Sequence, residues 1–112
     1  WKLTLGNYVW IGESVWIDNL DNITIGNHVC ISQGAMLICG SHNYKQKSFD
    51  LITKGITLND GVWIGAKSII LPGVVAESHS ILGAGSVISK NLESFTLYKG
   101  NPAEKVGSRI IS

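Results

Sequence analysis

Hydrophobic positions along this chain recur with a period of six, which is neither the period of a helix nor the alternation of a long strand. Between residues 58 and 88 an aliphatic side chain occupies every sixth position: Leu58, Ile64, Ile70, Ala76, Leu82 and Ile88. A small or β-branched residue follows four positions later, at Val62, Ser68, Val74, Ser80 and Ser86. A helix with 3.6 residues per turn cannot generate this spacing. The pattern predicts short strands separated by tight turns, with one strand in each hexapeptide.

A longer self-similarity indicates that three hexapeptides form one turn of a coil. Residues 3–7 (LTLGN) return as residues 23–27 (ITIGN) and again as residues 56–60 (ITLND), at offsets of 20 and 33. Residues 9–12 (VWIG) return as residues 62–65, at an offset of 53. Both motifs fit coils of 18 residues that are interrupted by insertions of two and fifteen residues. The predicted coils begin near Leu5, Ile25, Leu58 and Ala76.

The sequence therefore predicts an all-β protein, a parallel β-helix of about four coils over residues 1–91. The insertions fall at residues 18–22 and at residues 43–55, and we expect the longer one to form a protruding loop. Residues 92–112 are expected to form a short tail that packs on the helix. Strands of successive coils would stack in parallel about 4.8 Å apart. Gly, Asn and Asp would take the turn positions that require positive φ.

The period leaves the hand of the coil open. The general preference for right-handed crossovers favours a right-handed β-helix, and a small sandwich of short strands is another alternative. Strict hexapeptide spacing disfavours the sandwich. Because four coils would expose both ends of a slender core, we expect capping or oligomerisation.

Composition narrows the functional classes. Nine basic and eight acidic residues give a net charge of +1, and no run of like charges indicates a nucleic-acid-binding surface. No apolar stretch is long enough for a bilayer, and the start lacks a signal-peptide pattern, so we expect a soluble, cytoplasmic protein without membrane partners. Cys30 and Cys39 are interpreted as reduced thiols. The chain opens on Trp1, inside a strand-like pattern and without an initiator Met, so we expect an amino-terminal part to be missing.

Four motifs give the repeats a family resemblance: residues 40–42 (GSH), 60–65 (DGVWIG), 82–87 (LGAGSV) and 100–103 (GNPA). With them, the chain resembles the hexapeptide-repeat acyltransferases, whose fold is a left-handed parallel β-helix. It is most similar to the maltose, galactoside and nodulation-factor O-acetyltransferases, and above all to the colanic-acid and other exopolysaccharide acetyltransferases. The opening residues 1–6 (WKLTLG) are typical of that last group. The resemblance implies a left-handed coil, acetyl-CoA as cosubstrate, and a homotrimer with active sites between subunits.

His42 is the first catalytic candidate, because it stands where the fifteen-residue insertion leaves the coil. Acyl transfer to an alcohol needs a base near neutral pH and then an acid for the leaving thiolate, and imidazole serves as both. On composition alone a solvated loop histidine is the simpler interpretation. The resemblance places the catalytic histidine of the family at this position.

Two other chemistries compete for the same side chains. Hexapeptide β-helices include zinc carbonic anhydrases, but gaps of 14 and 37 residues separate His28, His42 and His79, which suits no three-histidine site. We interpret His28 and His79 as structural turn residues and predict no metal. Cys39 is close enough in sequence to serve as a nucleophile with a histidine base. Direct transfer needs no covalent intermediate, so Cys39 is better explained as a small core residue.

The resemblance also implies a site for coenzyme A. In this implied site, Trp63 flanks the pantetheine end of coenzyme A. The pantetheine arm is lined by the backbone near Gly65, Ala66, Gly83 and Ala84, and the nucleotide is approached by Ser89 and Lys90. Each is equally explained as a turn or strand residue. The tail departs from the family pattern, so whether Lys105 or Arg109 supplies a cation for the nucleotide stays open.

Acceptor binding has weaker sequence support. Asp18, Asn19 and Asp21 lie at the two-residue insertion, where their polar groups suit sugar hydroxyls, although all three are also common turn formers. Tyr44 and Phe49 in the long insertion would stack on a sugar or anchor the loop to a neighbouring subunit. The predicted function is acetyl transfer from acetyl-CoA to a carbohydrate hydroxyl. The alternative is a non-catalytic β-helix that serves as an assembly or binding module.

Overall fold

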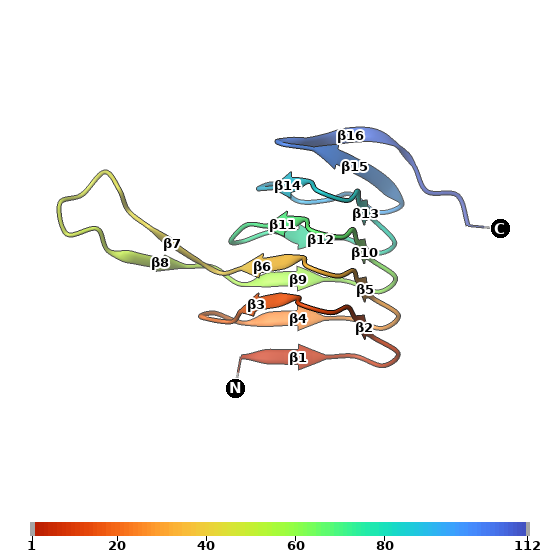
Figure 1. Ribbon diagram of the computed structural model, residues 1–112, viewed down its shortest axis with the longest axis horizontal. Coiled ribbons are helices and arrows are strands. Elements are labelled where there is room, and N and C mark those ends of the chain that lie inside the picture. Colours follow the sequence, from red (N-terminus) through yellow and green to blue (C-terminus); the bar gives the residue numbers. More distant parts are fainter. Residues whose placement is uncertain (1, 112) are drawn as a thin grey trace.

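The computed structural model describes residues 2–111, and its strands stack into three sheets around one core (Figure 1). Sheet A contains β1 (Leu3–Leu5), β4 (Ile23–Ile25), β9 (Ile56–Leu58) and β12 (Val75–Ala76). Sheet B contains β2 (Trp10–Ile11), β5 (Cys30–Ile31), β10 (Trp63–Ile64), β13 (Ile81–Leu82), β15 (Thr96–Gly100) and β16 (Ala103–Ser108). Sheet C contains β3 (Trp16–Asp18), β6 (Met36–Ile38), β11 (Ile69–Ile70) and β14 (Val87–Ile88). The chain visits A, B and C in turn, as a parallel β-helix does.

Strand pairing confirms the alignment that the sequence motifs predict. Leu3 pairs with Ile23, and Ile23 pairs with Ile56, all in parallel. Trp10 and Trp63 both pair with Cys30, one from each side. The insertions therefore leave the register of the stack unchanged.

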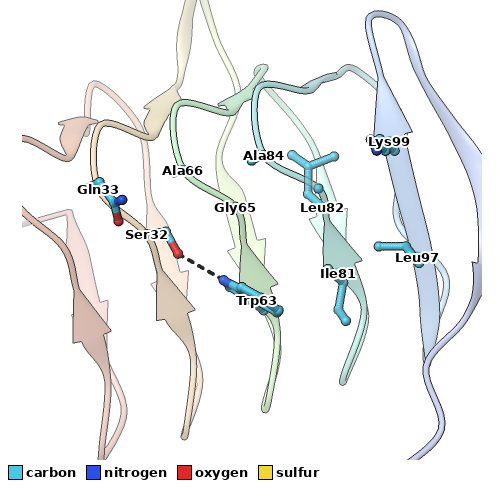
Figure 2. A pocket seen from close by; sticks show the side chains of 11 residues that line it. Ser32, Gln33, Trp63, Gly65, Ala66, Ile81, Leu82, Ala84, Leu97 and Lys99 are labelled. Atoms are coloured by element: carbon cyan, nitrogen blue, oxygen red, sulfur yellow. Dashed lines mark hydrogen bonds between the residues drawn. The ribbon is translucent and has the colours of Figure 1, made fainter.

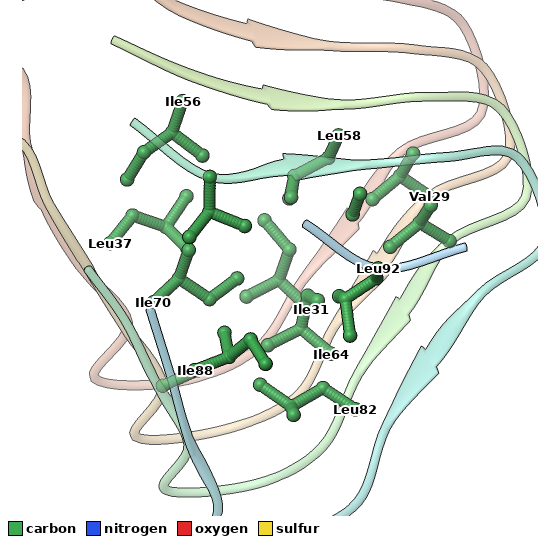
Figure 3. Close-up of a cluster of buried hydrophobic side chains, with 14 of the residues drawn as sticks. Val29, Ile31, Leu37, Ile56, Leu58, Ile64, Ile70, Leu82, Ile88 and Leu92 are labelled. Carbon is green, nitrogen blue, oxygen red and sulfur yellow. The ribbon is translucent and has the colours of Figure 1, made fainter. Parts of the chain in front are cut away.

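The core is a column of inward side chains, one row from each sheet (Figure 3). The aliphatic positions of the period, from Leu58 to Ile88, are all at most 1% exposed, as the period predicts. Ser68, Ser80 and Ser86 are also fully buried. Ser68 donates to the Gly83 carbonyl and Ser80 to the Glu77 carbonyl, while Ser86 accepts from the Gly100 N–H, so no buried hydroxyl loses a partner.

The turns differ from the prediction. Positive φ does occur at glycines, but never at Asn or Asp among the described residues. The glycines are Gly34, Gly61, Gly73, Gly85 and Gly100, and the other residues with positive φ are Tyr8, Ser14, His28, Phe49, Lys67, His79 and Phe95. The Asn and Asp side chains instead link successive coils. Asn27 Oδ1 accepts from the Asn7 N–H, and Asp60 Oδ1 accepts from the Asn27 N–H. In these turns Asn27 and Asp60 therefore contribute hydrogen bonds between coils, and neither residue adopts positive φ.

The long insertion forms an antiparallel hairpin that projects from the stack (Figure 1). Its strands are β7 (Gly40–His42) and β8 (Leu51–Thr53), so the excursion starts at Gly40, three residues before the predicted boundary. Among residues 2–111 we find no helix that is long and apolar enough to cross a membrane.

The sequence assigns residues 92–112 to a tail, of which the described part, residues 92–111, extends the stack at its carboxy-terminal end. Leu92 forms a parallel bridge with Ala76, and β15 adds to sheet B in parallel with β13. Tyr98 on β15 is 2% exposed and continues the inward row above Leu82. β16 then folds back antiparallel on β15. This hairpin closes one end of the core, while the other end, at β1, has no such cover within the described residues (Figure 1).

The three outer faces differ in polarity. The outward row of sheet A begins with threonines and reads Thr4, Thr24, Thr57 and Val75. The outward row of sheet B is apolar and reads Trp10, Cys30, Trp63, Ile81 and Leu97. The outward row of sheet C is also apolar and reads Trp16, Met36, Ile69 and Val87. Trp10 is 68% exposed and Trp16 is 62% exposed, so two faces present apolar side chains to their surroundings.

Candidate active site

His42 is held in a defined orientation at the end of β7. Its Nδ1 lies 3.0 Å from the backbone carbonyl oxygen of Phe49, on the opposite side of the hairpin loop. A carbonyl oxygen only accepts, so Nδ1 carries the hydrogen and donates it. Nε2 of the neutral imidazole is then left with a free lone pair on an exposed side chain. This is the tautomer that a general base requires.

The Phe49 side chain reinforces this orientation. Its ring stacks on the imidazole of His42, with 4.3 Å between ring centroids and 13° between planes. Phe49 has φ +51°, a conformation that side chains other than glycine adopt rarely. The hairpin tip fixes this conformation, because the Phe49 N–H donates to Gln46 and the Asn43 N–H donates to Asp50. From the sequence, Phe49 was predicted only to stack on a sugar or to anchor the loop. Its contact with His42 could not be predicted, because that contact depends on the folded loop.

We expect Phe49→Ala to lower kcat for the predicted acetyl transfer between about 10-fold and 100-fold, because a loosely held His42 would spend less time in the orientation that the predicted general base needs. KM for acetyl-CoA should not change, and Phe49→Tyr should restore the rate. Phe95 is a matched control, since it stacks on His79 at 4.8 Å and also has positive φ. Steady-state kinetics of acetyl transfer would measure kcat for each variant. An equal loss of kcat in Phe95→Ala would mean that only stability had changed.

A groove of about 750 Å³ runs across sheet B and the turns that lead from it to sheet C (Figure 2). Its size is within the range of pockets that bind small molecules. Its walls are largely apolar, and the Trp63 indole is fixed at one side because Nε1–H donates to Ser32 Oγ at 3.0 Å. The lining residues are Ser32, Gln33, Trp63, Gly65, Ala66, Ile81, Leu82, Gly83, Ala84, Leu97 and Lys99.

Of the residues proposed for coenzyme A, Trp63, Gly65, Ala66, Gly83 and Ala84 all line this groove. The others lie elsewhere in the chain. Ser89 lines a separate cleft at the base of the hairpin. Lys90 is paired with Glu104, and Lys105 is paired with Glu93, whose hydrogen bond raises the pKa of Lys105.

Arg109 has a structural contact. Its guanidinium donates to the backbone carbonyl oxygens of Gly61 and His79 and so ties the carboxy-terminal segment to the turns. Lys99, which sequence reasoning did not select, supplies the positive charge in the groove and forms no ion pair within residues 2–111. Its side chain lies over Gly83, where an added Cβ would be 3.3 Å from Lys99 Cγ. Its place on β15 could be identified only once residues 96–100 were known to form a further strand of sheet B.

The residues proposed for the acceptor differ in their positions and contacts. Asp18 lies at the base of the hairpin, since a Cβ added to Gly40 would be 3.5 Å from its carboxylate. Asp21 is a turn former, because its Oδ1 accepts from the Asn22 N–H. Tyr44 is 79% exposed at the hairpin tip and contacts His42 through the backbone, where the Tyr44 N–H donates to the His42 carbonyl. Asn19 is half-buried between these positions.

Cys39 and the remaining histidines lie in structural positions. Cys39 is fully buried, and this burial raises the pKa of its thiol, which disfavours the thiolate that a nucleophile requires. His28 stacks on Tyr8, and His79 stacks on Phe95. No group of three or more potential metal ligands occurs in the part of the chain that the structure describes.

His42 and the groove do not meet within one chain. No residue of β7, β8 or the loop between them lines the groove. The hairpin leaves from the turn between sheets C and A, whereas the groove follows sheet B and the turns to sheet C. His42 and the groove therefore lie at different corners of the prism.

Comparison with known proteins finds relatives along almost the whole chain, although no family model matches it. A putative colanic acid biosynthesis acetyltransferase, WcaF of Escherichia coli, is 36% identical over 110 residues, which cover 98% of this chain and 60% of that protein. The galactoside O-acetyltransferase of Escherichia coli is 31% identical over 87 residues, covering 75% of this chain and 43% of that protein.

A solved structure gives the same result. A hexapeptide-repeat-containing acetyltransferase of Vibrio cholerae, complexed with acetyl coenzyme A, superposes with a TM-score of 0.90 at 29% identity. The alignment covers 98% of this chain and 62% of that one, so the chain spans less than two thirds of these relatives. The resemblance inferred from the repeat motifs is thus confirmed: a colanic-acid and a galactoside acetyltransferase are relatives of this chain, and its fold is that of a hexapeptide-repeat-containing acetyltransferase.

Proposed function

We propose that this chain transfers an acetyl group from acetyl-CoA to a hydroxyl of a sugar or polysaccharide precursor. The observation that carries the proposal is the fixed tautomer of His42, in which Nδ1 donates to Phe49 and Nε2 is free to accept a proton. The names of two relatives, a putative colanic acid biosynthesis acetyltransferase and a galactoside O-acetyltransferase, support a carbohydrate acceptor. Because acetyl-CoA is a donor used inside cells, we place the reaction in the cytoplasm.

In the proposed reaction, His42 Nε2 removes the proton from the acceptor hydroxyl as its oxygen attacks the thioester carbonyl carbon. The tetrahedral intermediate carries its negative charge on the former carbonyl oxygen, where backbone N–H groups stabilise it. Collapse of the intermediate breaks the carbon–sulfur bond. The imidazolium returns its proton to the departing thiolate, so the acetyl ester and free CoA are formed and His42 is regenerated.

We assign the groove along Trp63 to the donor. The pantetheine arm is long and has amide groups, which suits apolar walls interrupted by the polar backbone of Ala66 and Ala84. Lys99 replaces Lys105 and Arg109 as the cation for the phosphates, since those two side chains are already engaged. The acetyl-CoA complex of the Vibrio cholerae relative supports this donor.

We propose a homotrimer of left-handed β-helices as the active form. Two of the three outer faces carry the apolar rows that begin at Trp10 and Trp16, and the third begins with threonines. In a threefold ring, the sheet B face of each copy would pack against the sheet C face of the next copy. This packing would cover both apolar rows and leave the threonine face of sheet A exposed. The same packing would place the hairpin of one copy near the groove of its neighbour.

Titration with acetyl-CoA tests the proposal through binding. We expect acetyl-CoA to raise the melting temperature of the protein, since a ligand that binds only the folded state stabilises it. Lys99→Gln should weaken acetyl-CoA binding about fivefold, the value of an exposed ion pair of about 1 kcal/mol. Lys2→Gln, beside β1 at the amino-terminal end of the stack and outside the groove, is the control and should bind normally.

The same titration separates the enzyme from a non-catalytic assembly or binding module, because such a module would be unaffected by acetyl-CoA. If stabilisation is observed, a screen of mono- and oligosaccharides with thiol release as readout would identify the acceptor. An amine in the same panel would test whether the nucleophile is always a hydroxyl.

A further inference from the structure

A second hollow lies at the base of the hairpin, and neither the repeat pattern nor the donor groove accounts for it. Its volume is about 290 Å³, and it shares no lining residue with the groove along Trp63. We call it the hairpin cleft. Its lining residues are Ser41, Ile52, Lys54, Leu71, Pro72 and Ser89.

The hairpin cleft and His42 lie on opposite faces of the same ribbon. Within the hairpin, Ser41 pairs with Ile52 and His42 pairs with Leu51. Successive side chains of a strand point to opposite faces, so Ser41 and Ile52 face the cleft while His42 and Leu51 face away from it. The cleft is therefore one residue along the backbone from the proposed base but on the other face of the hairpin, so an extended ligand that reaches both passes around the edge of the ribbon.

Lys54 is the cation of the cleft, and its position is well constrained. Its backbone N–H donates to the Cys39 carbonyl at 3.0 Å, which anchors the residue to the stack. Its aliphatic stem passes over Gly73, where an added Cβ would lie 3.2 Å from Lys54 Cδ. The ammonium group forms no ion pair within residues 2–111. The cleft thus presents a positive charge without a neutralising partner of its own.

The rest of the cleft is suited to a sugar. Ser41 and Ser89 contribute two hydroxyls, each of which can donate and accept. Ile52, Leu71 and Pro72 form an apolar wall of the kind that packs on the face of a pyranose ring. Since the volume lies just below the range of about 300 to 1,000 Å³ for drug-sized ligands, the cleft suits one sugar ring better than a nucleotide.

We propose that the hairpin cleft binds an anionic sugar residue of the acceptor, with its charged group on Lys54 and its hydroxyls on Ser41 and Ser89. This inference rests on the proposed function, because it takes the acceptor to be a carbohydrate. The sugar in the cleft is a neighbour, along the same saccharide, of the one whose hydroxyl is acetylated at His42. A carboxylate and a phosphate present the same charge to Lys54, so the experiment must separate them.

The test measures binding without acetyl-CoA, so that it does not depend on turnover. Glucuronate, glucose 1-phosphate and glucose are titrated at matched ionic strength, and the melting temperature is followed. We expect an anionic sugar to stabilise the protein more than glucose does. Stabilisation by glucuronate identifies a carboxylate, and stabilisation by glucose 1-phosphate identifies a phosphate.

Lys54→Gln should weaken binding of the anionic sugar about fivefold, as expected for an exposed charge pair. Lys47→Gln is the matched control, because Lys47 lies on the same hairpin and outside the cleft. Ser89→Ala gives a second test if Lys54→Gln folds poorly, and it should weaken all three sugars.

Equal stabilisation by glucose and both anionic sugars, or full binding by Lys54→Gln, would overturn the proposal. Failure of acetyl-CoA to bind would count against the proposed function alone, since the sugar titration contains no donor. The two ideas can therefore fail separately.

Discussion

His42→Ala should lower kcat for acetyl transfer by about 10²-fold to 10⁴-fold, the usual contribution of a general base. The loss is expected because no other side chain of the hairpin offers a free imidazole nitrogen. Thermal stabilisation by acetyl-CoA should be retained, because His42 does not line the donor groove. Thiol release under saturating donor and acceptor would measure the rate.

His28→Asn is the matched control for this variant. His28 has φ +57° in a turn, and Asn is one of the few residues that tolerate this region, so the backbone should be undisturbed. Its ring stacks on Tyr8, away from the hairpin. Turnover by His42→Ala at close to the wild-type rate would rule out the proposed mechanism, whereas loss of rate in both variants would indicate damage to the fold.

Gly65→Ala should destabilise the protein by about 3 kcal/mol, at the upper end of the cost of overpacking. A Cβ on Gly65 would lie 2.5 Å from the backbone nitrogen of Ala84 and 2.7 Å from the Leu82 carbonyl oxygen. Both are backbone atoms of the next coil, so they cannot rotate away as a side chain would. The Gly65 N–H also donates to that carbonyl, and this bond would lengthen as the coils separate. Urea denaturation monitored by Trp fluorescence would measure the free energy of unfolding.

Gly107→Ala makes the same chemical change on the outer strand β16, where no heavy atom lies within 4 Å of the added Cβ. Its unfolding midpoint should equal that of the wild type. The argument from close approach of the coils would be wrong if both variants unfolded at the same urea concentration.

The position of the groove along Trp63 was partly predictable. Trp63, Gly65 and Gly83 were selected from the resemblance and do line the groove, because the turn motifs that carry the resemblance also form its wall. The cations were not predictable in the same way. Lys105 and Arg109 are close to the expected tail motif in sequence, but their partners come from other parts of the chain. Lys99 acquires its place only through the pairing of β15 with β13.

The hexapeptide period by itself determined the stack: which side chains point inward, which strands pair and in which register. The period determines these features because every coil repeats the same local geometry. Two side chains six residues apart therefore take equivalent places in successive hexapeptides and point to the same side of the chain, toward the core or away from it. The tertiary structure alone decided where the chemistry lies. Phe49 fixes the tautomer of His42 through a folded loop, and Lys54 and Ser89 share a cleft although they are far apart in sequence. Such contacts depend on distances across coils and around corners, and no local pattern of residues encodes those distances.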